Sequence, residues 1–144
     1  MFLKFSIVPK SALLLGFAGL IPFFGTAAVS IVPDMPLQHF SLRALLAYGA
    51  VILTFLGGIR WGLAMVSSGP TNLFGPLFVS VVPALLAWFA LLLPSSLGLI
   101  LLALGFAGVL VADLRLSTAP TWYPILRLPL SAGAIISLSL GLFT

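Results

Sequence analysis

One short stretch, FLGGIRWG at residues 55–62, decides how this chain is interpreted, because it sets a full positive charge inside an otherwise apolar segment. Moving a charged side chain to the centre of a bilayer costs about 2.5–3.5 kcal/mol on insertion scales, so such residues are rare in spanning helices. The same stretch also holds a large amphipathic ring, Trp61, and three glycines. Both the charge and the glycines therefore need a structural or functional explanation.

The composition around this stretch is that of an integral membrane protein. Of the 144 residues, 62% are apolar and only 6% are charged, and the mean hydropathy is +1.33. Soluble domains carry about 25% charged residues. Apolar runs long enough to cross a bilayer recur along the chain, which is typical of spanning helices. The alternation of apolar and polar residues that is typical of a transmembrane β-barrel is absent.

We therefore predict an all-α integral membrane protein that forms one membrane domain over residues 1–144, a bundle of five transmembrane helices. Pro22 predicts a kink within the first helix, and His39 is expected in the loop at 33–41, with a second turn at 67–75. The five helices are expected at residues 11–32, 42–66, 76–93, 97–114 and 122–143.

The basic residues predict the orientation in the membrane. The net charge of +4 arises from six basic and two acidic residues, which form no patch suited to nucleic acid. Lys4, Lys10, Arg115 and Arg127 fall on the N-terminal side of a five-helix topology, and only Arg43 falls on the other side. The positive-inside rule then places the N-terminus inside and the C-terminus outside; inside is the cytoplasm in a bacterial inner (plasma) membrane and the matrix in a mitochondrion.

This topology brings polar residues from three helices to similar depth near the inner face. Asp113 is the only acid within a predicted span, so it is the expected partner of Arg60 or Arg127, and pairing would spare both charges an unpaired burial. The candidate cluster comprises Arg60, Trp61, Asp113, Trp122, Tyr123 and Arg127.

Each member of this cluster has a functional and a structural interpretation. Arg60 could bind an anionic lipid head group or line a solute path, or it could be a paired or snorkelling arginine. Asp113 could relay protons or serve as a counter-ion. The aromatic residues could stack on a quinone or a lipid, or form the aromatic belt found at membrane interfaces.

Small residues are expected to pack the helices together. In lipid, rows of small side chains let helix backbones approach closely. The predicted packing positions are Gly57, Gly58 and Gly62 in the second helix and Gly133, Ser137 and Gly141 in the fifth.

Catalytic signatures are missing from the sequence. With no cysteine, one histidine (His39) and two acids, the chain offers no nucleophile triad, no metal-ligand spacing and no phosphate-binding loop. We expect no enzyme, no bound metal and no cofactor.

Several motifs, in this order along the chain, resemble a bacterial domain-of-unknown-function family related to mitochondrial transmembrane protein 69. The resemblance covers nearly the whole chain and implies a small multi-helix inner-membrane protein, but brings no established activity. The motifs are Gly19–Phe23, Tyr48–Ala50, Gly57–Gly62, Pro83 through Trp88 to Pro94, Asp113, Pro120–Pro124 and Leu126-Arg127.

Two functions stay open at this point. The first is an accessory, scaffold or assembly subunit of a larger membrane complex, which fits the short loops and small-residue rows. The alternative is a small transporter or a lipid- or quinone-binding protein that uses the inner-face cluster. The helix middles offer little polarity beyond Thr54, Ser80 and Ser137, which disfavours transport. Expected partners are membrane lipids and other integral membrane proteins or further copies of the chain.

Overall fold

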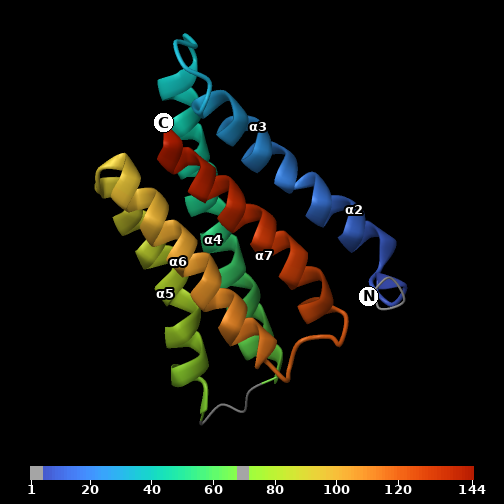
Figure 1. The fold of residues 1–144 in the computed structure, drawn as a ribbon. Helices are drawn as coiled ribbons and strands as arrows, with labels where there is room; N and C mark the ends of the chain where they lie inside the picture. Colours follow the sequence, from blue (N-terminus) through green and yellow to red (C-terminus); the bar gives the residue numbers. More distant parts are fainter. Residues whose placement is uncertain (1–4, 68–71) are drawn as a thin grey trace.

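The computed structural model describes residues 5–67 and 72–144, so Lys4 and residues 68–71 of the expected turn lie outside the described part. All regular structure within these ranges is helical (Figure 1). The elements are α2 (Lys10–Ala18), α3 (Leu20–Ser30), α4 (Gln38–Ser67), α5 (Phe74–Leu92), α6 (Ser95–Leu114), α7 (Tyr123–Leu140) and the 3₁₀-helix η2 (Gly141–Phe143).

Five helical segments are long and apolar enough to cross a membrane, which confirms the predicted five-helix bundle. The first segment, Lys10–Ser30, consists of α2 and α3 together, and the last, Tyr123–Phe143, of α7 and η2. The start of α2 and the end of η2 lie toward opposite ends of the bundle (Figure 1). Which end faces the cytoplasm stays a prediction.

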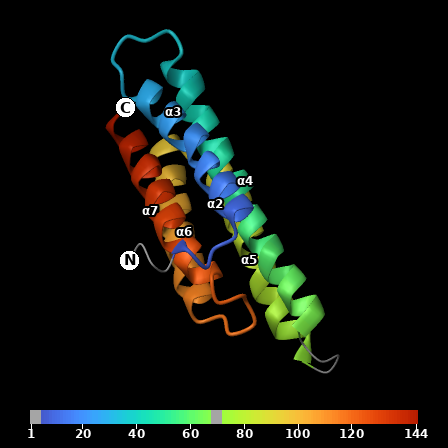
Figure 2. The same ribbon diagram turned by 90° about the vertical axis from the view of Figure 1, so that its right-hand side faces the viewer.

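The long helix α4 organises the bundle. It packs on α3, α5 and α6, while α7 packs on α3 and α6, as Figures 1 and 2 show from two sides. The helices meet in one apolar core around α4. Its largest fully buried apolar side chains are Phe23, Leu45, Leu53, Leu99, Leu102, Phe106 and Leu138.

The first span is broken at Gly19, one turn before Pro22. Proline has no N–H to donate to the carbonyl four residues earlier and its ring crowds that carbonyl, so the expected kink becomes a break between two helices. The Tyr48 hydroxyl donates a hydrogen bond of 2.7 Å to the Gly19 carbonyl oxygen at this point. Beyond the break, α3 packs closely on α4 and α7, whereas α2 packs much less closely and has no buried residue.

The start of α4 differs from the sequence expectation. The helix begins at Gln38 rather than near residue 42, so His39 lies in its first turn, exposed, and not in the loop. No proline follows Pro36 in this segment to stop the helix from starting early. The Gln38 side chain also donates a 2.9 Å hydrogen bond to the Ser30 carbonyl oxygen and so ties the start of α4 to the end of α3.

The predicted packing positions divide into two groups. A methyl group added at Gly57 would lie 2.5 Å from the Ser80 carbonyl oxygen of α5, and those added at Gly133 and Gly141 would lie within 2.9 Å of leucine side chains. Ser137 is fully buried as well.

Gly58 and Gly62, in contrast, have nothing within 4 Å of an added methyl group, so they do not pack closely on another helix of the described bundle, and their role as packing positions stays a prediction. Consecutive helical positions are rotated by about 100°. The face that carries Gly57 meets α5, and Gly58 therefore points to the outer surface. The four-residue spacing reveals a small-residue row but not the direction it faces.

Candidate functional site

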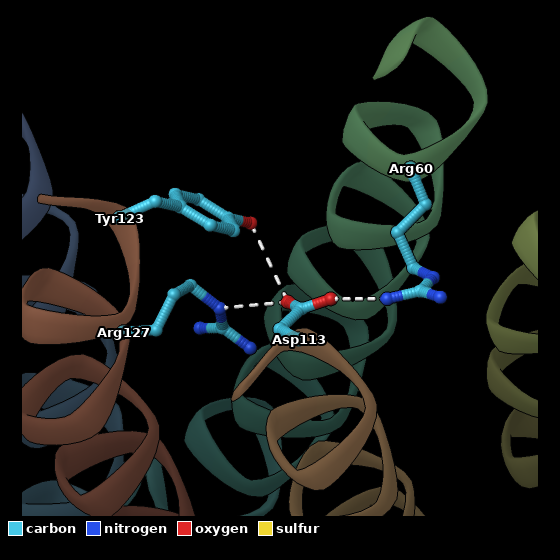
Figure 3. Close-up of polar contacts among 4 residues, drawn as sticks. All are labelled: Arg60, Asp113, Tyr123 and Arg127. Atoms are coloured by element: carbon cyan, nitrogen blue, oxygen red, sulfur yellow. Dashed lines mark hydrogen bonds and ion pairs between the residues drawn. The ribbon is translucent and has the colours of Figure 1, made fainter. Parts of the chain in front are cut away.

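Asp113, the penultimate residue of α6, is the centre of a buried charge cluster that we define as Arg60, Asp113, Tyr123 and Arg127. Its side chain is fully buried. One carboxylate oxygen, Oδ1, accepts a hydrogen bond of 2.7 Å from Arg60 Nη1, and the other, Oδ2, accepts one of 3.1 Å from Arg127 Nε (Figure 3). The Tyr123 hydroxyl also donates to Oδ2 over a longer 3.4 Å.

Three helices bring these side chains to one end of the bundle. Arg60 lies about 10 Å from the end of α4 at Ser67, at 1.5 Å per residue. Asp113 comes just before α6 ends, and α7 begins with Tyr123. Because residues four apart share one face of a helix, Tyr123 and Arg127 both point toward the carboxylate. We call this the α6–α7 end of the bundle.

Charge does not balance within the cluster. Two guanidinium groups share one carboxylate, which leaves one positive charge without a counter-ion. The side chains of Arg60 and Arg127 are only 15% and 5% exposed, so water screens this excess charge poorly. Burying an ion without a counter-ion costs on the order of several kcal/mol of folding free energy, even after the surrounding protein has relaxed.

Hydrogen bonding within the cluster is incomplete as well. Arg127 Nη2 and Arg60 Nε are buried and have no hydrogen-bond partner among the described residues. The hydroxyl of Ser131, one turn after Arg127 on α7, is also buried without a partner. Buried polar groups in folded proteins are nearly always hydrogen-bonded, and each exception calls for an explanation.

A cavity of about 360 Å³ adjoins Arg127 on the side of the cluster away from Arg60; we call it the α2–α7 cavity. It exists because α2, which precedes the break at Gly19, packs loosely, while α3, α4 and α7 enclose the rest. Its walls are almost entirely apolar, and its polar groups gather at the start of α7. These are Trp122, Tyr123 and Arg127, whereas Leu15, Phe23, Ile52, Ile59, Leu130 and Ala134 are among the apolar lining residues.

On the opposite side of Asp113, Arg60 lines a smaller cavity of about 230 Å³ between α4, α5 and α6. Figure 3 shows the carboxylate between the two arginines, with Arg60 and Arg127 reaching it from opposite directions. Each guanidinium thus borders its own cavity. Arg127 borders the larger one.

The structure brings together four of the six residues proposed for the cluster, and it pairs Asp113 with both arginines rather than with one. Trp122 lies beside Tyr123, with 6.3 Å between ring centroids in an edge-on arrangement, and lines the α2–α7 cavity. Trp61 does not belong to the group. It follows Arg60 by about 100° of rotation around α4, so its side chain faces outward and is 41% exposed.

Two features escaped the analysis of the sequence. The cavity depends on how far α2 lies from α4 and α7, which no local pattern encodes. Ser131 could have been found, because it follows Tyr123 and Arg127 at a constant spacing of four and therefore shares their face of α7.

The family that matches this chain brings no activity with it. A family model described as "Protein of unknown function (DUF3429)" matches residues 8–143. The chain belongs to the DUF3429 family. This confirms the family suggested by the sequence motifs.

Two relatives carry the name Transmembrane protein 69. The protein from Xenopus tropicalis is 42% identical over 134 residues, which cover 90% of this chain and 53% of the relative. The protein from Mus musculus is 35% identical over 135 residues, which cover 90% of this chain and 54% of the relative. The chain thus spans about half the length of these curated relatives. No solved structure matches it. With five spans and these relatives, the chain is a multi-pass membrane protein.

Proposed function

We propose that this protein binds an amphiphilic small molecule, a lipid or a lipid-like compound, in the α2–α7 cavity. One observation carries the proposal: an apolar cavity inside a membrane bundle ends at a buried guanidinium that has an unused donor. A purely structural ion pair would need neither the cavity nor the free N–H group.

The size and lining of the cavity suit such a ligand. Ligand sites are usually concave, mostly apolar and roughly 300–1,000 Å³ in volume, with a few convergent polar groups that fix orientation. The cavity of about 360 Å³ falls in this range, and its polar groups converge at the start of α7. A ligand with an apolar body and a polar end matches both parts of the lining.

We place this function in a bacterial inner membrane with the α6–α7 end toward the cytoplasm. Lys10, at the start of α2, and Arg115, just after α6, add exposed positive charge near this end. Arg43 is the basic residue of α4 near the other end. This distribution supports the cytoplasmic orientation through the positive-inside rule.

Binding is proposed rather than catalysis. Asp113 is the one acid in the described spans, and both of its oxygens are already engaged by arginines. No group of three or more histidine, cysteine, aspartate or glutamate side chains gathers anywhere in the described ranges. The cluster therefore lacks a free base or nucleophile set of the kind that catalytic sites need.

A second candidate, an accessory or assembly subunit of a larger membrane complex, is favoured by a different surface. Gly58 and Gly62 form a four-residue step on the outer face of α4 with open space above both. Steps of this kind allow a second helix to approach closely in lipid. A partner helix on this face, from another protein or another copy, would explain why these two positions are small.

One experiment addresses both candidates. A tagged copy is purified from native membranes in a mild detergent, and lipids and proteins that remain bound are identified by mass spectrometry. A defined small amphiphile at about one copy per chain supports the cavity proposal. A stoichiometric protein partner with no retained amphiphile favours the accessory function instead.

A cavity-filling variant links any retained amphiphile to its site. Ala12 lines the α2–α7 cavity, so Ala12→Phe adds a ring to this space, whereas Ala18→Phe adds the same ring to the exposed surface of the same helix. We expect Ala12→Phe to remove the retained amphiphile and Ala18→Phe to keep it. Equal retention in both variants would contradict the cavity proposal.

A further inference from the structure

We infer that the ligand of the α2–α7 cavity is an anionic amphiphile whose single negatively charged head group, a carboxylate or a phosphate, contacts Arg127. The inference rests on the proposed function and specifies the chemistry of the ligand. Three independent observations carry it: the charge balance, the free donor and the direction of the cavity.

The charge balance calls for one further negative charge. Within the cluster, two guanidinium groups face one carboxylate, an excess of one positive charge in a water-poor site. The other acid of the chain, Asp34, lies before the start of α4, and Arg60 is about 33 Å further along that helix at 1.5 Å per residue. Asp34 therefore cannot compensate the excess, and a bound anion would.

The free donor shows where that anion would bind. Arg127 uses Nε for Asp113, and its Nη2 is buried without a partner among the described residues. The Arg127 side chain is 95% removed from solvent and lines the cavity. Guanidinium groups prefer carboxylate and phosphate oxygens, and such charge-assisted hydrogen bonds are about twice as strong as neutral ones. A neutral carbonyl could fill the donor but would leave the charge unbalanced.

The direction of the cavity agrees with the orientation of a lipid in one leaflet. Arg127 lies near the α6–α7 end, whereas Ala134 lines the same cavity about 10 Å further along α7, toward the middle of the bundle. A ligand with its head group at Arg127 therefore extends its tail toward the bilayer centre. The tail would run along Leu130 and Phe23, both of which line the cavity.

Matched pairs of probes test the charge requirement on the unmodified protein. The detergent-purified, delipidated full chain is titrated with oleate and with oleyl alcohol, and separately with a phosphatidylglycerol and a diacylglycerol of identical acyl chains. Binding is followed by native mass spectrometry. We expect the anionic member of a pair to bind at least about tenfold more tightly, since charge-assisted hydrogen bonds are about twice as strong as neutral ones. Preference for oleate alone identifies a carboxylate ligand, and preference for phosphatidylglycerol alone identifies a phosphate.

Two variants assign that preference to Arg127. Arg127→Gln removes the charge next to the cavity, while Asp113 keeps Arg60 as its partner. Arg115→Gln removes an exposed charge at the same end of the bundle and serves as the control. We expect Arg127→Gln to lower anion binding about tenfold and to leave oleyl alcohol nearly unchanged. Arg115→Gln should change neither by more than about twofold. Arg127→Lys, which keeps the charge, should retain part of the preference if Arg127→Gln does not fold.

The outcomes separate the two proposals. If neither anionic probe binds more tightly than its uncharged counterpart, and Ala12→Phe blocks the binding of all of them, the cavity binds amphiphiles but the inference of an anionic head group is wrong. An anion preference that survives unchanged in Arg127→Gln also overturns the head-group inference. If Ala12→Phe leaves the binding of every probe unchanged, the proposed function itself fails.

Discussion

The two sides of α4 are built in contrasting ways. On one side α4 packs closely on α5, where a methyl group at Gly57 would meet the Ser80 carbonyl at 2.5 Å; α5 in turn packs closely on α6, where one at Gly98 would meet the Ala90 carbonyl at 2.6 Å. Toward the first span, α3 packs well, but α2 leaves a cavity of about 360 Å³. The side toward α5 and α6 thus combines backbone contact with the smaller cavity of about 230 Å³, whereas the side toward α2 holds the larger cavity.

The difference arises from what the small residues contact. Gly57 and Gly98 face backbone carbonyls, which cannot move without distorting a helix. Gly16 on α2 faces the tips of the Leu130 and Leu126 side chains, which are flexible groups. Membrane helices gain stability from van der Waals contact rather than from water exclusion, so the side with backbone contact should be the more stable one.

Asp113 is where the two sides meet, and its loss should have the largest effect. Asp113→Asn leaves Arg60 and Arg127 buried without a counter-charge, so we expect a loss of about 3–5 kcal/mol in the free energy of unfolding. The measurement is reversible unfolding in mixed micelles. Asp34→Asn, which changes the exposed acid of the α3–α4 connection, should cost less than about 0.5 kcal/mol. A similar small cost for both would mean that the cluster does not hold the helices together.

Neighbouring glycines test the closely packed side. Gly57→Ala must push α5 away from α4, and we expect it to destabilise by about 1–3 kcal/mol, as overpacking does in other proteins. Gly58→Ala adds the same methyl group to open space. It should be neutral or slightly stabilising, because alanine is the better helix former by about 1 kcal/mol. Thermal unfolding in the same detergent compares the two variants, and equal effects would contradict the assigned faces of α4.

Much of this architecture could be predicted from the sequence because bilayer crossing is a strong constraint. Runs of apolar residues fixed the number of spans, and the alternation of their directions brought Arg60, Asp113 and Arg127 to one end. Chemistry supplied the pairing, since Asp113 is the only acid available to two arginines within the described spans. Position along the chain was enough for each of these steps.

Two features of the site could not be predicted: the direction in which each side chain points around its helix, and the distance between neighbouring helices. Local sequence patterns determine neither of them. Trp61 adjoins Arg60 in sequence but faces outward, and Gly58 adjoins Gly57 but contacts nothing within 4 Å. Pro22 predicted a kink, yet how far α2 departs from the bundle depends on packing against α7. The cavity is a product of that distance and could not be predicted.

The smallest loss of stability is expected on the side of α4 that faces the first span, at the hydrogen bond between Tyr48 and Gly19. Tyr48→Phe removes the hydroxyl that reaches the Gly19 carbonyl but keeps the ring, which packs edge-on against Phe23 with 4.8 Å between centroids. We expect a loss of about 0.5–1.5 kcal/mol in the free energy of unfolding. Because this bond lies at the break between α2 and α3, hydrogen exchange should rise in α2 more than in α5. An equal rise of hydrogen exchange in α2 and α5 would show that the first span is held as firmly as α5, and the contrast between the two sides of α4 would then disappear.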